Sequence, residues 1–428
     1  MFFKIKIVYF LLKIKLEKFL SHFFPNFIFS AKKYLLLNSL KDSRFYSNFS
    51  RKGNNLSFFP IINKLIFMEN FDNINTCGIT IDQAKNIAHQ SEESRDFSPM
   101  INNISIGMST GTSGNQSLFL VGENERAKWV AYMLDRVVKF SLKSQKIAFF
   151  LRSNNKLYES SNSKLLQFNF FDIFLDFNLH IKRLNDINPD VLIAQPSVLR
   201  LICEKISSGI IKISPQKVIS VAEVLTKEDK EYFQDIFSVK IDQVYQCAEG
   251  FLAYTCKYGY LHFNEDFLII EKKYLNDEKT KFHPIITDLI RRKQPIVRYE
   301  LNDIITERKN CKCGSKFIAI EKIEGRSDDT FRFKNIYNQK IIIFPDLLRR
   351  KIVMSDSNIE DYQIIQKDEI SVTLYVKSNT KQSFSLARKA ITDYLLNLEI
   401  KNIEITNSTK LIFNLGDKKR RVINEHKI

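Results

Sequence analysis

The sequence is poor in glycine, with 12 in 428 residues. Three of them, Gly107, Gly111 and Gly114, fall in the short segment ISIGMSTGTSGNQSLFL, from Ile104 to Leu120. Glycine has the freest backbone of all residues, and here it is interspersed with serine and threonine hydroxyls. This concentration indicates a turn with a special task.

Cysteine is also scarce, and long hydrophobic runs are missing from the opening segment. The six cysteines are irregularly spaced in a chain without an evident secretion signal, which argues against a disulfide scaffold and favours a reducing, cytoplasmic location. In the opening segment the longest apolar run without a charge is Ile7–Leu12. It is too short for a signal peptide or a membrane-spanning helix.

The net charge of +17 is concentrated at one end of the chain. Residues Met1–Phe67 contain twelve Lys or Arg and two Asp or Glu, and the remainder is only mildly basic. We therefore do not expect a nucleic-acid partner. The basic, apolar opening segment forms either a helix that packs on the main domain, which we favour, or a peripheral contact with an anionic membrane.

Between the loop and Arg326, the chain alternates short apolar runs with helical patterns. Runs typical of buried strands are KIAFFL, FDIFLDF, DVLIAQ and KVISVAE, and helical spacing is seen in ENERAKWVAYMLDRVVKFSL, PSVLRLICEKIS and TKEDKEYFQDIF. This alternation predicts an α/β domain with a mostly parallel sheet.

After Arg326 the pattern becomes strand, helix, strand, strand, helix, strand, over residues 340–407. This is the element order of a ferredoxin-like α+β domain. We therefore predict an N-terminal helical segment over residues 1–67, a large domain over 68–326 and a small mobile domain over 327–428.

The glycine-rich segment is predicted to join a strand over Ile104–Met108 to a helix that begins near Glu123. Backbone amides of such a loop, hydroxyl donors and a helix N-terminus together suit an anion, and phosphate is the natural ligand. The lysine of a Walker-type loop is missing, because Gly114 is followed by Asn115, Gln116 and Ser117. A tight turn without a ligand is the alternative.

Further motifs follow in order: SRDFSP before the loop, then SVAEVL, VYQCAEG, RYELND, CKCGS, IEGRSDD and GDKKRRV. With the loop, this ordered set resembles the adenylate-forming acyl/aryl-CoA ligase superfamily, in particular its phenylacetate-CoA ligase-like branch. The resemblance covers most of the chain. It implies that a carboxylic acid is joined to the α-phosphate of ATP with release of pyrophosphate, and that the acyl group is then passed to a thiol, with CoA as the expected acceptor.

The resemblance assigns the phosphates of ATP to the loop residues Ser109, Thr110, Gly111, Thr112, Ser113 and Gly114. Family loops commonly end in a lysine, and this chain has Gln116, Ser117 and Leu118 there. One charge contact with the phosphates is therefore expected to be missing.

The resemblance also assigns the nucleoside and the metal. Tyr245 matches the aromatic residue that lies against adenine, and Glu249 matches the acid that holds Mg²⁺ on the phosphates. Ala222 and Glu223 match the lining of the adenine and acyl pocket. Asp303 matches the aspartate that accepts the ribose hydroxyls, although Leu301 and Asn302 replace the usual Thr-Gly before it.

The remaining assignments concern domain motion and catalysis. Arg326 matches the arginine that contacts ribose or phosphate, and Asp328 lies at the hinge of the small domain. Lys418 matches the catalytic lysine that stabilises negative charge on the transferring groups, with Lys419 as the second choice. A solvated basic tail is the competing interpretation of these lysines.

Three sulfurs and one imidazole could hold a structural zinc ion: Cys256, His262, Cys311 and Cys313. The CKCGS turn could bring two thiolates to one ion, but the overall spacing is not that of a standard zinc finger. Buried free thiols are the alternative, and Cys247, which lies beside Glu249, could replace one ligand.

The predicted function is thus an AMP-forming acid–thiol ligase that uses ATP and Mg²⁺. Two other classes remain open. One is a degenerate, non-catalytic family member in surface-polymer or capsule synthesis, because the loop lysine is missing. The other is a zinc-stabilised nucleic-acid-binding protein, which leaves the loop and the C-terminal lysine unexplained. The identity of the acid and the oligomeric state are not indicated by the sequence.

Overall fold

The computed structural model describes most of the chain: residues 2–51, 53, 55–108, 117–138, 143–151, 166–173, 175–326, 329–343, 345–356, 358–411 and 420–426. The chain forms two compact units. The large unit comprises Met1–Lys273, Pro284–Leu301 and Glu307–Glu321, and the small unit comprises Tyr274–His283, Asn302–Thr306 and Lys322–Ile428. The predicted division into segments 1–67, 68–326 and 327–428 stays a prediction about domain organisation.

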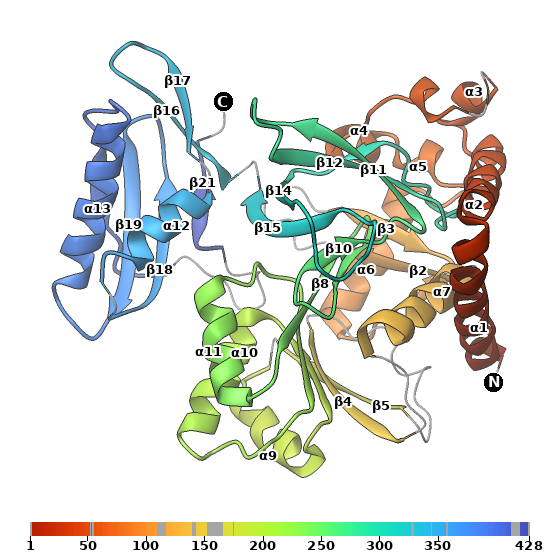
Figure 1. Cartoon of the computed structure of the whole chain (residues 1–428), viewed down its shortest axis with the longest axis horizontal. Coiled ribbons are helices and arrows are strands. Elements are labelled where there is room, and N and C mark those ends of the chain that lie inside the picture. Colours follow the sequence, from red (N-terminus) through yellow and green to blue (C-terminus); the bar gives the residue numbers. More distant parts are fainter. Residues whose placement is uncertain are drawn as a thin grey trace. The chain divides into compact units, whose positions relative to one another are not determined.

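The large unit begins with helices (Figure 1). They are α1 (Phe2–Phe23), α2 (Pro25–Ser39), α3 (Ser47–Ser50), α4 (Lys64–Glu69), α5 (Phe71–Ile74) and α6 (Ile81–Ser94), with 3₁₀ turns η1 (Leu40–Asp42) and η2 (Leu56–Phe58). Helix α6 begins at a capping box in which Thr80 and Gln83 satisfy each other's backbone amides. No helix among the described residues is both long and apolar enough to cross a membrane.

A small antiparallel sheet follows, formed by β1 (Met100–Ile101), β2 (Ile104–Met108) and β3 (Leu118–Val121). Its apolar face packs with α5 and α6 in a cluster that includes Phe71, Ala84 and Leu120. After β3 comes α7 (Glu123–Met133), which continues as one turn of π-helix, η3 (Leu134–Val138). The predicted strand at Ile104–Met108 and the helix beginning at Glu123 are both confirmed.

Parallel strands form the centre of the large unit in the order β8-β7-β6-β4-β5. Their bounds are β4 (Gln145–Leu151), β5 (Leu166–Asp172), β6 (Val191–Ala194), β7 (Lys217–Ser220) and β8 (Ile241–Cys247). The predicted strands in KIAFFL, DVLIAQ and KVISVAE are confirmed. The predicted strand over FDIFLDF is displaced towards the N-terminus, because the segment that pairs with β4 at the edge of the sheet is Leu166–Asp172.

Helices α9 (Asn178–Ile187), α10 (Pro196–Ser207) and α11 (Lys227–Phe237) pack with these strands (Figure 1). Proline at the first position starts α10, and the Thr226 hydroxyl accepts the Asp229 amide at the start of α11. Phe150 and Phe171 stack with their ring centroids 4.5 Å apart inside the shared core. The parallel α/β architecture predicted from the sequence is confirmed.

Antiparallel strands complete the sheet on the other side of β8. They are β9 (Gly250–Thr255), β10 (Leu261–Phe263), β11 (Leu268–Tyr274), β12 (Lys281–Asp288), β13 (Tyr299–Glu300), β14 (Asp303–Arg308) and β15 (Ala319–Arg326). Four of these strands, β11, β12, β14 and β15, contribute residues to both compact units.

The small unit contains β16 (Phe331–Lys334), β17 (Lys340–Ile343), α12 (Pro345–Val353), β18 (Ile359–Gln366), β19 (Ser371–Ser378), α13 (Ser383–Asn397), β20 (Glu404–Asn407) and β21 (Val422–Asn424). The predicted order of strands and helices is confirmed, but the sheet is not the ferredoxin-like one. Strand β17 pairs with β16 in a separate hairpin, and the four-stranded sheet has the order β20-β19-β18-β21. The predicted first strand, β17, is therefore not part of the four-stranded sheet, and β21 occupies an edge of that sheet, parallel to β18.

We predict that Gly107→Ala destabilises the large unit. Gly107 lies opposite Phe119 in the β2–β3 ladder, and a Cβ at this position would be 2.0 Å from Cζ of the Phe119 ring. The ring must move, so the free energy of unfolding should fall by about 1–3 kcal/mol in urea denaturation. The same substitution in a Phe119→Ala background should cost much less. An equal cost in both backgrounds would rule out the ring contact as the cause.

Candidate functional site

Several predicted site residues lie outside the described residues. They are the loop Ser109, Thr110, Gly111, Thr112, Ser113 and Gly114, the hinge residue Asp328, and the lysines Lys418 and Lys419. Their assigned roles stay predictions. The structure does describe the elements on either side of each of these segments.

The loop joins two strands, so the predicted direct connection from loop to helix is wrong. Met108 pairs with Leu118, and β3 separates the loop from α7. The N-terminus of α7 already has a negative group, because Glu125 accepts the Gly122 amide at 2.6 Å. The sequence SLFLV forms this strand because Leu118 and Leu120 are buried on the same face.

The carboxyl ends of β6, β7 and β8 bring several predicted residues to one edge of the parallel sheet. In the register of β7 and β8, Ser220 lies opposite Gln243; Ala222 follows the end of β7, and Tyr245 lies in the last part of β8. Ala222 has φ +67°, a left-handed conformation that is unusual for a residue with a Cβ. Tyr245 is 8% exposed. Ligands of open parallel sheets bind at this edge.

Glu223 has a structural partner at this edge. Its carboxylate accepts the Ser197 amide at 3.1 Å and the Ser197 hydroxyl at 2.9 Å. Ser197 lies in the first turn of α10, so a negative charge faces the positive end of the helix dipole. Glu223 therefore holds the β7–α11 connection against the start of α10.

Glu249 lies in the tight turn between β8 and β9, and a buried arginine holds this turn. Nη1 of Arg291 donates to the Ala248 carbonyl at 2.9 Å and to the Glu249 carbonyl at 3.0 Å. Its Nη2 donates to the Leu120 carbonyl and to Oε1 of Gln294, both at 3.1 Å. One guanidinium thus connects the Glu249 turn to β3, the strand that follows the glycine-rich loop.

Two more side chains strengthen this connection. Oε1 of Gln294 also accepts the Leu120 amide at 2.9 Å, and Glu125 accepts the amides of Arg292 and Lys293. The sequence analysis missed Arg291, Gln294 and Glu125. The partners of Arg291 are far away in the sequence, and only the charge and amide chemistry of Arg291 and Gln294 within the run DLIRRKQP could have signalled a polar cluster. Glu125 lies outside this run, on α7.

In the small unit, the predicted ribose residue and the predicted arginine lie close together. Asp303 begins β14 and Arg326 ends β15, with 3.8 Å between Nε of Arg326 and Oδ1 of Asp303. The Asp303 carbonyl also accepts from His283 Nδ1 at 3.2 Å when that nitrogen is protonated. The structure thus brings together two residues from separate motifs, both of which the resemblance assigns to nucleotide binding.

A second ion pair in the small unit lies next to the predicted hinge and the predicted catalytic segment. Arg420 donates to the buried carboxylate of Asp329, and the Arg420 carbonyl accepts from Gln363 Nε2 at 2.9 Å. Burial raises the pKa of Asp329, and the charge of Arg420 opposes this shift. The pair thus joins Asp329, which follows the predicted hinge residue Asp328, to Arg420, which follows Lys419.

The four predicted zinc ligands come together in the large unit. The ligand atoms of Cys256, His262, Cys311 and Cys313 all lie within 4.8 Å of one another. The Sγ atoms of Cys256 and Cys311 are 3.8 Å apart, and Sγ of Cys313 is 3.4 Å from Nε2 of His262. Tetrahedral zinc with ordinary bond lengths places two sulfurs about 3.8 Å apart and a sulfur and a nitrogen about 3.6 Å apart.

The local structure around these four residues fits a metal site. His262, on β10, has its Nδ1 3.0 Å from the Phe317 carbonyl, which favours a proton on Nδ1 and leaves the Nε2 lone pair facing the sulfurs. Gly314, with φ +79°, makes the turn that follows Cys311 and Cys313. Cys247 is not among the four, and its Sγ lies 3.9 Å from the Gly250 carbonyl.

Comparison with solved structures identifies the fold. A crystal structure of 2-hydroxyisobutyryl-CoA ligase in its postadenylation state is similar over 93% of this chain and 89% of that chain, with a TM-score of 0.65 and 13% identity. The chain has the fold of adenylate-forming acyl-CoA ligases. A structure from a study of fatty acyl-adenylate ligases of E. coli and L. pneumophila has a TM-score of 0.54 and 11% identity, over 76% and 70% of the two chains.

A structure of an anthranilate-CoA ligase in complex with anthranoyl-AMP has a TM-score of 0.50 and 12% identity, over 74% of this chain and 66% of that one. No protein-family model and no curated protein matches the sequence. The fold is therefore shared with these ligases, whereas the identities are too low to transfer a substrate.

Asp288, the last residue of β12, lies next to the network around Arg291. We predict that Asp288 makes the free energy of unfolding depend on pH. It accepts the amides of Ile290 and Arg291, and burial raises its pKa above the ordinary 3.8. Between the ordinary and the raised value the folded state binds more protons than the unfolded state. The free energy of unfolding should therefore fall as pH rises through this window.

Asp288→Asn keeps the Oδ1 acceptor and cannot ionise. Urea denaturation of both proteins from about pH 4 to pH 8 should show a flatter dependence on pH for the variant. Parallel curves for the two proteins would contradict the assignment to Asp288.

Proposed function

We propose that this chain is an AMP-forming ligase that activates a carboxylic acid with ATP and Mg²⁺ and passes the acyl group to a thiol, with CoA as the acceptor. The fold supports this proposal, and so does the order of the motifs. The observation that carries it is the buried Arg291, which holds the Glu249 turn and the strand after the glycine-rich loop in one network.

In the first step a carboxylate oxygen attacks the α-phosphorus of ATP, and the bond to the bridging oxygen breaks to release pyrophosphate. In the second step the thiol sulfur attacks the acyl carbon, AMP leaves, and the thiol proton is lost to solvent. Both steps build up negative charge on oxygen, so the chain needs positively charged groups and donors at these atoms.

Each role belongs to a residue with suitable chemistry. Tyr245 lies against adenine at the end of β8, and Ala222 lines the same pocket at the end of β7. Glu249 supplies an oxygen ligand to Mg²⁺, which neutralises the phosphates when it is bound. Glu223 shapes this pocket through its hold on Ser197.

Two of the remaining roles belong to the ion pair of Asp303 and Arg326, and the others belong to residues outside the described part of the chain. Asp303 accepts the ribose hydroxyls, and Arg326, already 3.8 Å from it, contacts ribose or phosphate. Ser109–Gly114 cover the β- and γ-phosphates, Asp328 is the hinge, and Lys418 stabilises the charge on the transferring groups.

Pyrophosphate release tests this function. With ATP, Mg²⁺ and a mixed panel of aryl and fatty acids, we expect release that depends on one class of acid. Glu249→Gln and Lys418→Ala should each lower the rate on the order of a hundredfold or more, because each removes a contact made in the transition state. Gly111→Val should abolish turnover and leave the fold intact.

Two exposed residues provide matched controls. Glu204→Gln on α10 and Lys381→Ala before α13 make the same chemical changes away from the site and should leave the rate unchanged. No release with any acid, together with no ATP binding in calorimetry, would instead support a non-catalytic member of this fold, consistent with Gln116, Ser117 and Leu118 in place of the loop lysine.

We also propose that Cys256, His262, Cys311 and Cys313 bind one structural zinc ion. The ion would join the β9–β10 turn to the loop before β15. Three thiolates and a neutral imidazole form a closed ligand set, which is typical of structural rather than catalytic zinc.

Metal analysis of the purified chain should find one zinc per chain. Cys311→Ser should lose most of this zinc and lower the free energy of unfolding by roughly 2 kcal/mol or more, because zinc binding contributes directly to folding. Cys247→Ser is the matched control and should keep both the zinc and the stability. Full zinc content in Cys311→Ser would refute this ligand set.

A further inference from the structure

The first two helices expose an unusual amount of large apolar surface. On α1, residues Ile5, Val8, Leu12, Leu16, Phe19 and Phe23 are 54–64% exposed. Their spacing of three, four or seven residues places them along one side of the helix. On α2, Phe27, Tyr34 and Leu35 are 56–71% exposed. We call these nine side chains the outer face.

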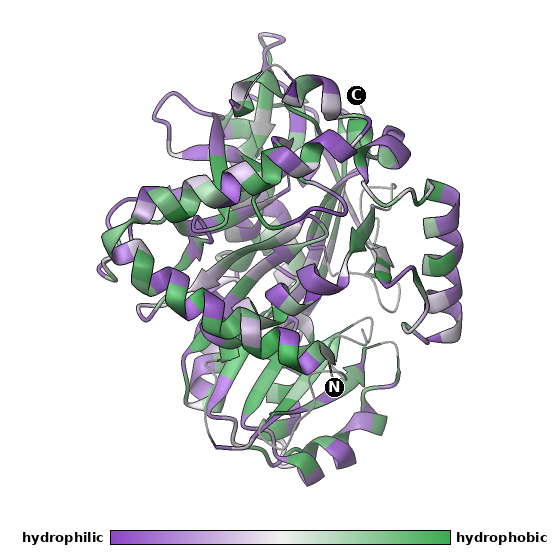
Figure 2. Cartoon of the chain, turned by 90° about the vertical axis from the view of Figure 1, so that its right-hand side faces the viewer, coloured by the Kyte–Doolittle hydropathy of each residue, from purple (hydrophilic) through white to green (hydrophobic). Residues whose placement is uncertain are grey.

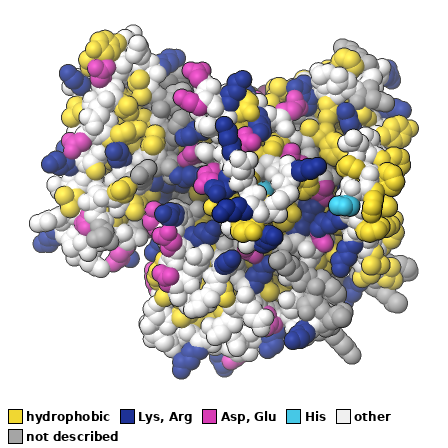
Figure 3. All heavy atoms as spheres, viewed as in Figure 1, with side chains coloured by type: hydrophobic (Ala, Val, Ile, Leu, Met, Phe, Trp, Pro, Cys, Tyr) yellow, Lys and Arg dark blue, Asp and Glu magenta, His cyan; other side chains and the backbone are white. Residues whose placement is uncertain are grey.

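The outer face is continuous in space. Figure 3 shows hydrophobic side chains gathered along the right-hand edge of the molecule, over α1 and α2. In Figure 2, which faces this side, the two helices that follow the label N cross the front of the view. Nine large apolar side chains that are exposed together on one surface mark a site that contacts an apolar partner.

The opposite side of α1 is already used for packing. Ile7, Leu11 and Ile14 are buried, and Lys6 pairs with Glu123 at 3.1 Å at the start of α7. Lys18 pairs with Asp135 on η3. The helix therefore packs on the large unit through one side, and the described residues leave the outer face uncovered.

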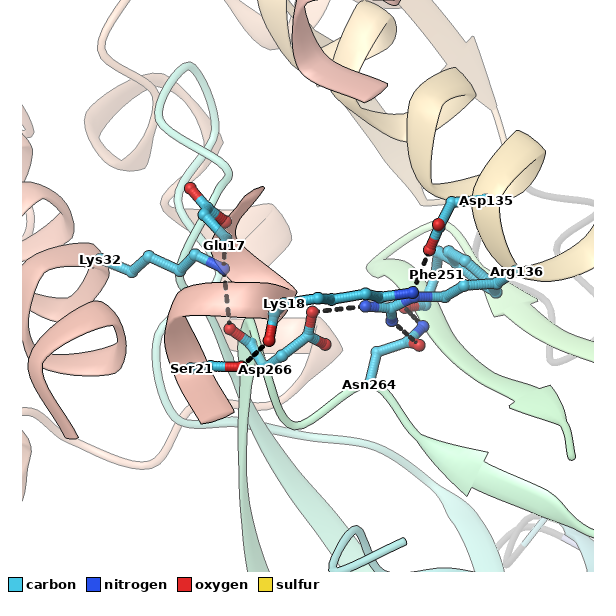
Figure 4. A network of polar contacts seen from close by, with 9 residues as sticks. All are labelled: Glu17, Lys18, Ser21, Lys32, Asp135, Arg136, Phe251, Asn264 and Asp266. Carbon is cyan, nitrogen blue, oxygen red and sulfur yellow. Dashed lines mark hydrogen bonds and ion pairs between the residues drawn. The ribbon is translucent and has the colours of Figure 1, made fainter. Parts of the chain in front are cut away.

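A polar network fixes this orientation (Figure 4). Lys32 of α2 lies 2.8 Å from Glu17 of α1 and donates to the Asp266 carbonyl at 3.1 Å. The Asp266 carboxylate in turn pairs with the buried Arg136. Because these charged groups are satisfied on the inner side, rotation of α1 to bury its outer face would break several ion pairs.

The borders of the outer face are basic. At about 100° per residue, Lys4 and Lys15 lie along one border of the α1 stripe and Lys13 lies along the other, and all three are exposed. The one acidic residue of α1, Glu17, is paired with Lys32 and lies 4.0 Å from Lys13. Long lysine side chains can place their ammonium groups at lipid headgroups while their stems cover apolar surface.

We propose that the outer face of α1 and α2 docks on an anionic membrane surface. An interfacial helix has this form: bulky apolar and aromatic side chains that enter the boundary of the acyl chains, with lysines on both sides that contact anionic headgroups. Helix α1 contains too many lysines to cross a bilayer, which agrees with the lack of spanning helices among the described residues.

The charge pattern favours a membrane over a second copy of this chain. If two outer faces packed together, the lysine borders of both copies would approach each other, and α1 offers no exposed carboxylate to pair with them. An anionic lipid surface instead places negative charge next to both lysine borders.

Vesicle co-sedimentation of the full chain tests the proposal. We expect binding to phosphatidylcholine vesicles that contain about 30% phosphatidylglycerol, weaker binding to phosphatidylcholine alone, and a decrease as salt is raised. Leu12→Ser combined with Phe19→Ser should weaken binding at least about tenfold, because two large apolar side chains no longer enter the bilayer.

Lys4→Gln combined with Lys15→Gln should weaken binding to the anionic vesicles on the order of tenfold and leave binding to neutral vesicles unchanged. Leu179→Ser combined with Leu396→Ser removes two exposed leucines elsewhere and should bind like the wild type. Urea denaturation of every variant checks that folding is retained.

Two results would overturn the proposal. One is a wild-type chain that does not sediment with either kind of vesicle. The other is self-association in analytical ultracentrifugation that Leu12→Ser with Phe19→Ser abolishes, since the outer face would then be an interface between copies.

Discussion

The guanidinium of Arg291 is the interaction on which the candidate site depends. It is buried, and a buried charge is tolerated only when acceptors replace the water it has lost. Its four acceptors come from the Glu249 turn, from β3 and from Gln294. Two segments that carry different parts of the predicted chemistry are thereby held at fixed positions in the large unit. One of these segments is β3, the strand that follows the glycine-rich loop.

Much of the fold could be predicted from local sequence. Strands β4, β6 and β7 are continuous apolar runs because they are buried on both faces, and α10 and α11 begin at a proline and at a threonine cap. The prediction of strand positions and sheet topology was wrong where the pairing with another strand decides the structure. Strand β17 pairs with β16, which precedes it in the chain, and β5 pairs with β4 at the edge of its sheet. The side of α1 that packs inward depends on ion pairs with α7 and η3, which no helical pattern contains.

The candidate site could be predicted in part for the same reason. The Cys/His group was found because unusual chemistry is visible in sequence, and the fold then brought its two halves together. Asp303 and Arg326 were found through the resemblance, and the structure places them near each other. Arg291 was missed, since an arginine in a run of basic residues is usually a solvated side chain. Its importance comes from three backbone carbonyls that lie at distant positions in the chain.

The position of Val422 also sets when the small unit can fold during synthesis. Val422 is fully buried in the core that Phe331, Leu348 and Ile391 begin, and β21 pairs in parallel with β18. A ribosome adds residues in order, so this core stays open until Val422 has left the exit tunnel. The parallel sheet of the large unit has no such delay, because its last parallel strand ends at Cys247. The core of the small unit should therefore close after the parallel strands of the large unit have been made, and its apolar surface stays exposed the longest.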